Sequence, residues 1–151
     1  MRVTARVDYA VRAGRELAGA HPGVVTAEAI TERQQLPPAF TKQILVRMRR
    51  AGLVAAHRGG DGGYYLARPP EAVTVADVVR AVEGPLADVR GEAPEQLDYP
   101  ADGDVLRTLW ISTRASLRLV LERVTLADLA AGHLPADVAA LTEQSGAWQR
   151  R

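Results

Sequence analysis

The stretch from Phe40 to Leu66, FTKQILVRMRRAGLVAAHRGGDGGYYL, decides the fold of this chain of 151 residues. Apolar residues recur in its first half at helical spacing, which predicts a helix with one face in a core; they are Phe40, Ile44, Leu45 and Met48. The other face is polar and cationic, with no acid close by in the sequence: Lys42, Gln43, Arg47, Arg49 and Arg50. Gly52 is placed to end this helix, and strands at 53–58 and 64–68 flank a glycine-rich turn. A cationic helix followed directly by a hairpin is the order of a winged helix-turn-helix, in which the helix enters the major groove and the hairpin forms the wing.

Two further helices are predicted before this stretch. Thr4 and Thr26 are placed as N-caps, the second of a short helix over residues 27–34. A turn at residues 35–38 follows, and the cationic helix runs from about Pro38 to Ala51. The two helices are thus separated by about four residues, which is helix-turn-helix spacing. Between the first two helices, residues 24–25 are suited to a short edge strand beside the wing.

Downstream, Thr74 and Thr125 are each followed three residues later by an aspartate, which predicts a capping box at the start of two more helices. Between them, residues 85–103 hold five acids, one arginine and three prolines. This composition predicts a loop with little core of its own, and a solvated linker is the simplest interpretation.

A long amphipathic helix is predicted from Asp104 to about Val124. Its apolar seam repeats at intervals of four and three residues: Leu106, Trp110, Thr113, Leu117, Val120 and Val124. A second row, residues 109, 116 and 119, widens the stripe. Since a small domain cannot cover a helix of this length, we expect the seam to meet a second subunit. The alternative is a helix packed back on its own domain.

Composition and charge narrow the function. Residues 1–68 hold eleven Arg and Lys against five Asp and Glu, whereas residues 69–151 hold eight against thirteen. The first half is therefore suited to a polyanion. The chain has no cysteine, which excludes disulfides and thiolate-ligated metal or iron–sulfur centres within it, and we expect no cofactor and no metal site. No HExxH or nucleophile-elbow motif occurs, so an enzyme is not expected, and no apolar run suggests a membrane span; a cytoplasmic protein is expected.

The segments MRVTARVDYAVRAGRELA, AFTKQILVRMRRAGLVAAHRGGDGGYYLAR and TLADLA together resemble the Rrf-two family of bacterial winged-helix regulators, with its IscR, NsrR and CymR types. The resemblance implies a homodimer on a palindromic operator and a sensing loop before the dimerisation helix. Cluster-binding members carry three cysteines in that loop and a fourth ligand after it. Here the matching positions are Gly91, a residue within 92–102, Asp104 and Arg107, which leaves no cluster ligand. The chain is in this respect more similar to the CymR type, whose DNA binding is set by a partner protein.

The resemblance also assigns candidate contacts to DNA. We expect Thr41, Lys42 and Gln43 at base edges or nearby phosphates, since Gln can pair with adenine and Lys with guanine. Arg47, Arg49 and Arg50 are expected at phosphates, Arg58 in the minor groove, and the wing glycines Gly60 and Gly62 beside the backbone. Phe40 is expected in the core.

The sequence thus predicts a mainly α fold with a small β wing. Three segments are expected: a winged helix-turn-helix domain at 1–83, an acidic loop at 84–103 in the sensor-loop position, and the dimerisation helix with short helices at 104–151. The predicted function is transcriptional regulation, as a repressor, by a homodimer on double-stranded DNA. The alternatives are a winged module that binds a protein, or the same regulator controlled by a partner protein or by a small effector in a pocket lined by Trp110 and Tyr99.

Overall fold

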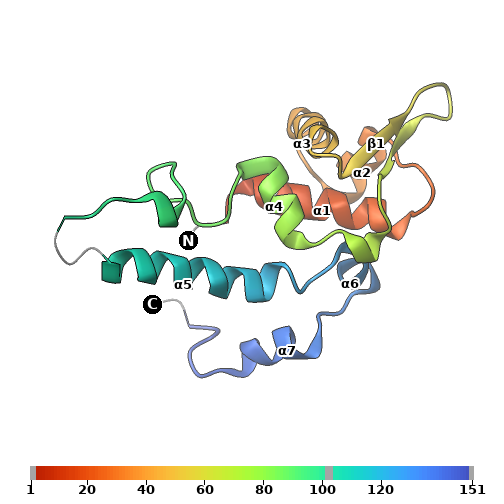
Figure 1. Ribbon diagram of the computed structural model, residues 1–151. Coiled ribbons are helices and arrows are strands. Elements are labelled where there is room, and N and C mark those ends of the chain that lie inside the picture. Colours follow the sequence, from red (N-terminus) through yellow and green to blue (C-terminus); the bar gives the residue numbers. More distant parts are fainter. Residues whose placement is uncertain (1–2, 101–103, 150–151) are drawn as a thin grey trace.

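The chain folds mainly into helices with one small sheet, as expected from the sequence (Figure 1). The computed structural model describes residues 3–100 and 104–149. Residues 1–2, 101–103 and 150–151 lie outside the described residues. They belong to the ends of the predicted segments 1–83, 84–103 and 104–151, respectively. The elements are α1 (Ala5–Gly19), α2 (Ala27–Gln34), α3 (Pro38–Arg50), β1 (Val54–His57), β2 (Gly63–Leu66), η1 (Pro70–Ala72), α4 (Val75–Glu83), η2 (Pro94–Gln96), α5 (Asp104–Leu121), α6 (Leu126–Ala131), α7 (Ala136–Ala139) and η3 (Ala140–Glu143).

Threonine caps begin four of these helices at the positions that the sequence predicts. The hydroxyls of Thr4 and Thr26 accept from the N–H groups of Val7 and Ala29 at 3.2 and 3.1 Å. Thr74 and Thr125 each form a complete capping box. The threonine hydroxyl accepts from the backbone N–H of the aspartate three residues later, and that aspartate's carboxylate accepts from the backbone N–H of the threonine. Each cap satisfies a donor that the first helical turn leaves free, which stabilises a helix by about 1 kcal/mol.

The core forms where α1 packs against α3, α4 and α6. Leu17, Leu45 and Leu126 are fully buried there, and α6 lies so close to α1 that a Cβ built on Gly14 would come within 3.0 Å of Leu126. A glycine on α1 thus allows the two helices to approach.

One core prediction for α3 is wrong. Phe40 is 41% exposed and packs edge-on against Tyr9, with the ring centroids 6.0 Å apart. Thr41 takes the buried place instead, so the inward face comprises residues 41, 44, 45 and 48.

The wing is an antiparallel pair with Val54 opposite Leu66 and His57 opposite Gly63. It projects beside α3 and reaches beyond the helices (Figure 1). The predicted edge strand is reduced to one bridge, in which Val25 and Tyr64 exchange two backbone hydrogen bonds of 2.8 Å. That bridge ties the base of the wing to the α1–α2 connection.

The acidic loop is better anchored than its composition predicts. Leu86 and Leu97 are buried, and η2 packs against α5. Arg107 of α5 also donates to the carbonyl of Leu97 at 2.9 Å. Two buried leucines and this hydrogen bond therefore hold the segment against the long helix.

The long helix ends at Leu121, before the predicted last seam residue. Val124 lies in the connection to α6, is 4% exposed, and its carbonyl accepts from the Val75 N–H at 2.9 Å. It therefore packs within its own chain, and its assignment to the seam is wrong. The neighbouring N–H of Leu126 donates to the carbonyl of Val73, so Thr74 and Thr125 form an antiparallel bridge that joins the starts of α4 and α6. No helix of the described residues has the length and apolar character that a membrane span requires.

Candidate nucleic-acid interface

The surface of α3 opposite the core has small apolar side chains and one side-chain amide at its centre, and cationic side chains at its edges. Ala39, Gln43, Val46 and Arg50 are exposed and follow one another at intervals of four, three and four residues, so they share one face. The sequence prediction included Gln43 and Arg50 but missed Val46, which is 39% exposed. The signal was available, because Val46 lies opposite the buried positions 41, 44, 45 and 48 on a helical wheel. Its methyl groups can contact a thymine methyl group in a major groove.

Lys42 and Arg47 occupy the two flanks of this face and each has a partner in the chain. The ammonium of Lys42 lies 3.8 Å from the carboxylate of Glu28 on α2, an acid that the sequence prediction had not placed nearby. Both side chains are mostly exposed, so this pair is weak and Lys42 remains able to reach outward. Arg47 donates to the carbonyl of Val82 on α4 at 3.3 Å, which turns it toward its own domain.

Thr41 does not belong to this surface. It is fully buried, its hydroxyl accepts from the hydroxyl of Thr31 at 2.9 Å, and it lies 3.4 Å from the carbonyl of Pro37. The prediction of a base or phosphate contact by Thr41 is therefore wrong. Its role is to join α2 to the start of α3.

The structure brings Arg49 and Arg58 together at one hollow between α3 and the wing. This hollow has a volume of about 570 Å³ and is also lined by His57 and Tyr64. Neither arginine lies within ion-pair distance of a carboxylate among residues 3–100 and 104–149. Two uncompensated guanidinium groups on one concave surface are suited to phosphate oxygens, for which the planar guanidinium offers paired donors.

The two wing glycines have different roles. A Cβ on Gly62 would lie 2.6 Å from the carbonyl oxygen of His57, and the Gly62 N–H already donates to Gly59 at 3.0 Å. Its amide is therefore committed to the turn and cannot donate to a phosphate. At Gly60 nothing lies within 4 Å of a built Cβ, so the turn itself does not require a glycine there.

Part of the predicted seam of α5 faces its own chain and part faces outward. Trp110 is half-buried and donates its indole N–H to the hydroxyl of Tyr99 at 3.1 Å, within its own chain. Thr113, Leu117 and Val120 are also half-buried. The most exposed apolar residues of the helix, here called the α5 stripe, are Val105, Leu106, Leu109 and Leu119, at 73%, 45%, 49% and 75% exposure.

Comparison with known proteins identifies the family over most of the chain. The model of the Rrf2 family, described as iron-dependent transcriptional regulators, matches residues 3–132. The chain belongs to the Rrf2 family. It is a DNA-binding transcriptional regulator and not an enzyme, and the sequence resemblance is confirmed.

Relatives within the Rrf2 family match nearly end to end. A Mycobacterium tuberculosis protein, Rv1287, provisionally named an HTH-type transcriptional regulator, is 45% identical over 144 residues, 95% of this chain and 89% of that protein. CymR of Bacillus subtilis is 34% identical over 131 residues, 86% of this chain and 90% of CymR. The solved structure of B. subtilis CymR, titled the global cysteine regulator, superposes with a TM-score of 0.73 at 31% identity over 87% of this chain and 97% of CymR. T. potens IscR gives 0.68 at 30% identity, over 100% of this chain and 93% of that structure.

The iron of the family description does not fit the residues of this chain. There is no cysteine in the sequence, and the described residues contain no group of three or more His, Asp or Glu side chains that could hold a metal ion. At the positions that match cluster ligands, Gly91 has no side chain, while Asp104 and Arg107 pair with each other at 2.7 Å. The described residues therefore offer no ligand set for an iron centre.

Proposed function

We propose that this Rrf2 protein acts as a homodimeric repressor that binds a palindromic operator without an iron–sulfur cluster. Residues 1–83 read DNA, residues 104–151 pair the two copies, and residues 84–103 connect them. The observation that supports pairing is α5 itself. None of its residues is buried against the described chain, although the α5 stripe is apolar. A helix about 27 Å long with an uncovered apolar stripe is stabilised by a second copy of itself.

The DNA contacts divide into two kinds. Gln43, Val46 and Arg50 lie on the exposed face of α3 and are proposed to meet base edges and phosphates in a major groove. Arg49 and Arg58 line the hollow between α3 and the wing and are proposed to bind phosphate oxygens of the DNA backbone there. Arg58 is also proposed to reach a narrow minor groove. A dimer repeats both sets of contacts on two half-sites about 34 Å apart.

The test is binding of the purified chain to a labelled duplex that contains its own promoter region, measured by fluorescence anisotropy across a chloride series. Tight binding should fall steeply with salt, because phosphate contacts release counterions. Arg58→Ala should weaken binding by about tenfold and flatten the salt dependence. Arg123→Ala is the matched control, since Arg123 is an exposed arginine that pairs with Asp137 and lies outside both the proposed DNA contacts and the α5 stripe.

The opposite result is equally informative. Equal and weak binding of wild type and Arg58→Ala to any duplex would remove Arg58 from the groove and favour a winged module that binds a protein. A sedimentation mass of one chain at the concentrations used would reject the homodimer.

A further inference from the structure

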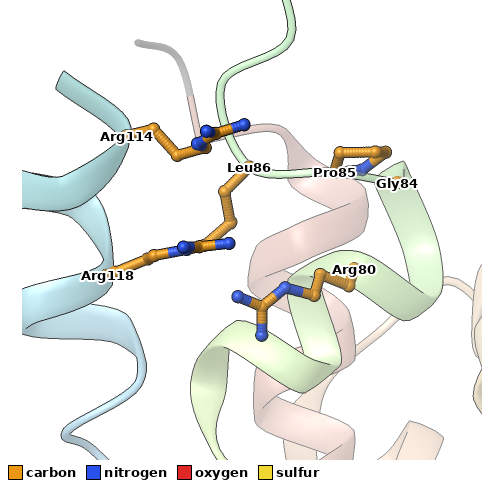
Figure 2. Close-up of a pocket in the computed structure, with 6 residues that line it drawn as sticks. All are labelled: Arg80, Gly84, Pro85, Leu86, Arg114 and Arg118. Carbon is orange, nitrogen blue, oxygen red and sulfur yellow. The ribbon is translucent and has the colours of Figure 1, made fainter. Parts of the chain in front are cut away.

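Three arginines from α4 and α5 converge on one cavity of about 360 Å³. Arg80 comes from α4, and Arg114 and Arg118 come from successive turns of α5. Gly84, Pro85 and Leu86 complete the lining where the chain leaves α4, and the cavity is open to solvent. Figure 2 shows the side chains of Arg114 and Arg118 extending from α5 toward Leu86, with the guanidinium group of Arg80 reaching into the same gap from the other side. We call this space the arginine cavity.

The acids around the arginine cavity compensate its cations only in part. Glu122 pairs with Arg80 and lies 3.6 Å from Arg118, so one carboxylate serves two guanidinium groups. Asp77 lies 3.7 Å from Arg80, but its carboxylate also accepts from the Thr74 N–H and pairs with Arg68. The carboxylates that pair with the three arginines, including Glu95 with Arg114, are not among the lining residues, so the groups that face the cavity itself are cationic.

Arg114 is the most enclosed of the three. Its side chain is 19% exposed and its partner is Glu95 of η2, at 2.9 Å. That hydrogen bond is the main reason that the pKa of Glu95 lies below its ordinary value. A guanidinium has five N–H donors, so a single carboxylate contact leaves donors available on a side chain that is mostly covered. An anion that offers two oxygens would satisfy them better.

We propose that the arginine cavity binds a small anion through a carboxylate or phosphate group, in competition with Glu95 for Arg114. The volume is at the lower end of the range for ligand sites, about 300–1,000 Å³, which suits a compact metabolite rather than a nucleotide. Pro85 and Leu86 supply an apolar wall for a short carbon skeleton. The ligand group lies between three guanidinium groups on two different helices.

The position of the cavity gives the ligand a route to the DNA-binding surface, and this step rests on the proposed function. Arg80 and Glu122 link α4 to the end of α5, and Val82 of α4 accepts from Arg47 of the recognition helix α3. An anion that displaces Glu95 would also release one of the contacts that hold η2 on α5. Occupancy of the cavity is therefore expected to change operator affinity through α4 and the loop.

The experiment is isothermal titration of the full chain, without DNA, with inorganic phosphate and separately with succinate, in chloride buffer at constant ionic strength. Wild type should show one saturable site per chain for at least one of these probes. Arg114→Ala and Arg118→Ala should each weaken it by at least about tenfold, as expected for loss of a charge-assisted hydrogen bond. Glu95→Gln should bind severalfold more tightly, because the competing carboxylate is then neutral.

Matched controls separate this site from general charge effects. Arg123→Ala and Glu143→Gln remove one charge of each sign at exposed positions outside the cavity and should leave the affinity unchanged. Saturation by phosphate alone assigns a phosphate-bearing ligand, and saturation by succinate alone assigns a carboxylate. The proposal is overturned if neither probe saturates, if both arginine variants bind as wild type does, or if Glu95→Gln binds no more tightly than Glu143→Gln.

Since this titration contains no DNA, failure of the proposed repressor function would leave its outcome unaffected. A second measurement tests the link between them: phosphate or succinate at saturation should shift operator affinity of wild type but not of Arg114→Ala. Thermal unfolding of each variant checks that the substituted chain is folded. If an arginine variant does not fold, Glu95→Gln still tests the site.

Discussion

The helices α3 and α5 are both amphipathic, but only α3 has its apolar face covered by the chain. Four of its thirteen residues are buried, whereas none of the eighteen residues of α5 is buried against the described chain. Their arginines differ in the opposite sense. Arg107, Arg114 and Arg118 of α5 pair with carboxylates, while Arg49 and Arg50 of α3 have no such partner within the two described ranges. In the single chain α3 therefore exposes unpaired positive charge among the described residues, and α5 exposes apolar surface.

The largest expected effect is on the covered face of α3. Leu45→Ala removes a fully buried side chain and should lower the free energy of unfolding by about 2–5 kcal/mol. Val46→Ala, its neighbour on the exposed face, should change that free energy by no more than about 0.5 kcal/mol. Urea denaturation followed by circular dichroism compares the two; similar losses would contradict the assignment of the two faces.

A polar substitution in the α5 stripe should have the opposite pattern. Leu109 is 49% exposed in the single chain, so Leu109→Asp should leave the secondary structure intact. Self-association should weaken at least about tenfold, because the substitution places a charge in the apolar stripe. Sedimentation velocity across a concentration series measures the shift. Ser145→Asp, which is exposed and lies outside α5, serves as a control for added charge. Unchanged association of Leu109→Asp would argue for pairing through another surface.

The wing allows a comparison between two neighbouring glycines. Gly62→Ala should destabilise the hairpin and weaken DNA binding, because the new Cβ would collide with the carbonyls of His57 and Gly59. Gly60→Ala should leave the free protein unchanged, so any loss of DNA affinity would then come from close approach of the duplex. Hydrogen exchange of the Tyr65 amide, in the residue paired with Ala55 of β1, and anisotropy with operator DNA separate the two effects. Equal exchange in both variants would show that the turn tolerates a Cβ at either position.

The smallest expected effect concerns pH. Hydrogen bonds from the N–H and hydroxyl of Thr125 hold the pKa of Asp128 below its ordinary value of 3.8. The stability that this carboxylate contributes is present above pH 3.8 and is lost as the pH falls through the lowered folded pKa. Asp128→Asn should therefore cost up to about 1 kcal/mol at neutral pH, and less in acid. Thermal melts from pH 7 to pH 2 follow the difference, which should not widen on acidification.

Local signals in the sequence predicted most of the fold. The four threonine caps, the glycine stop after α3 and the glycine-rich hairpin depend on residues within a few positions of each other. Phe40 and Thr41 could not be told apart in this way, since positions 40 and 41 both fit an inward face with 44, 45 and 48. What decides between them is Thr31, whose hydroxyl meets Thr41 from another helix.

The candidate sites were less predictable for the same reason. Glu28 beside Lys42, Val82 beside Arg47 and Glu95 beside Arg114 are contacts between elements, which periodicity does not encode. Val124 fits the heptad spacing, but the capping box at Thr125 ends the helix before it. The exposed face of α3 was nevertheless predictable for Lys42, Gln43, Arg49 and Arg50, because these residues follow the helical period of a single element.

The bridge between Thr74 and Thr125 has a consequence for how this architecture changes over evolutionary time. The bonds that join α4 to the far end of α5 run from the Val75 and Leu126 N–H groups to the Val124 and Val73 carbonyls, so they belong to the main chain. Side-chain substitutions in the α5 stripe or in the arginine cavity would leave these main-chain hydrogen bonds in place. In an assembly of two copies, the spacing of the two recognition helices would then be inherited with the backbone, while the surface around it remains free to diversify.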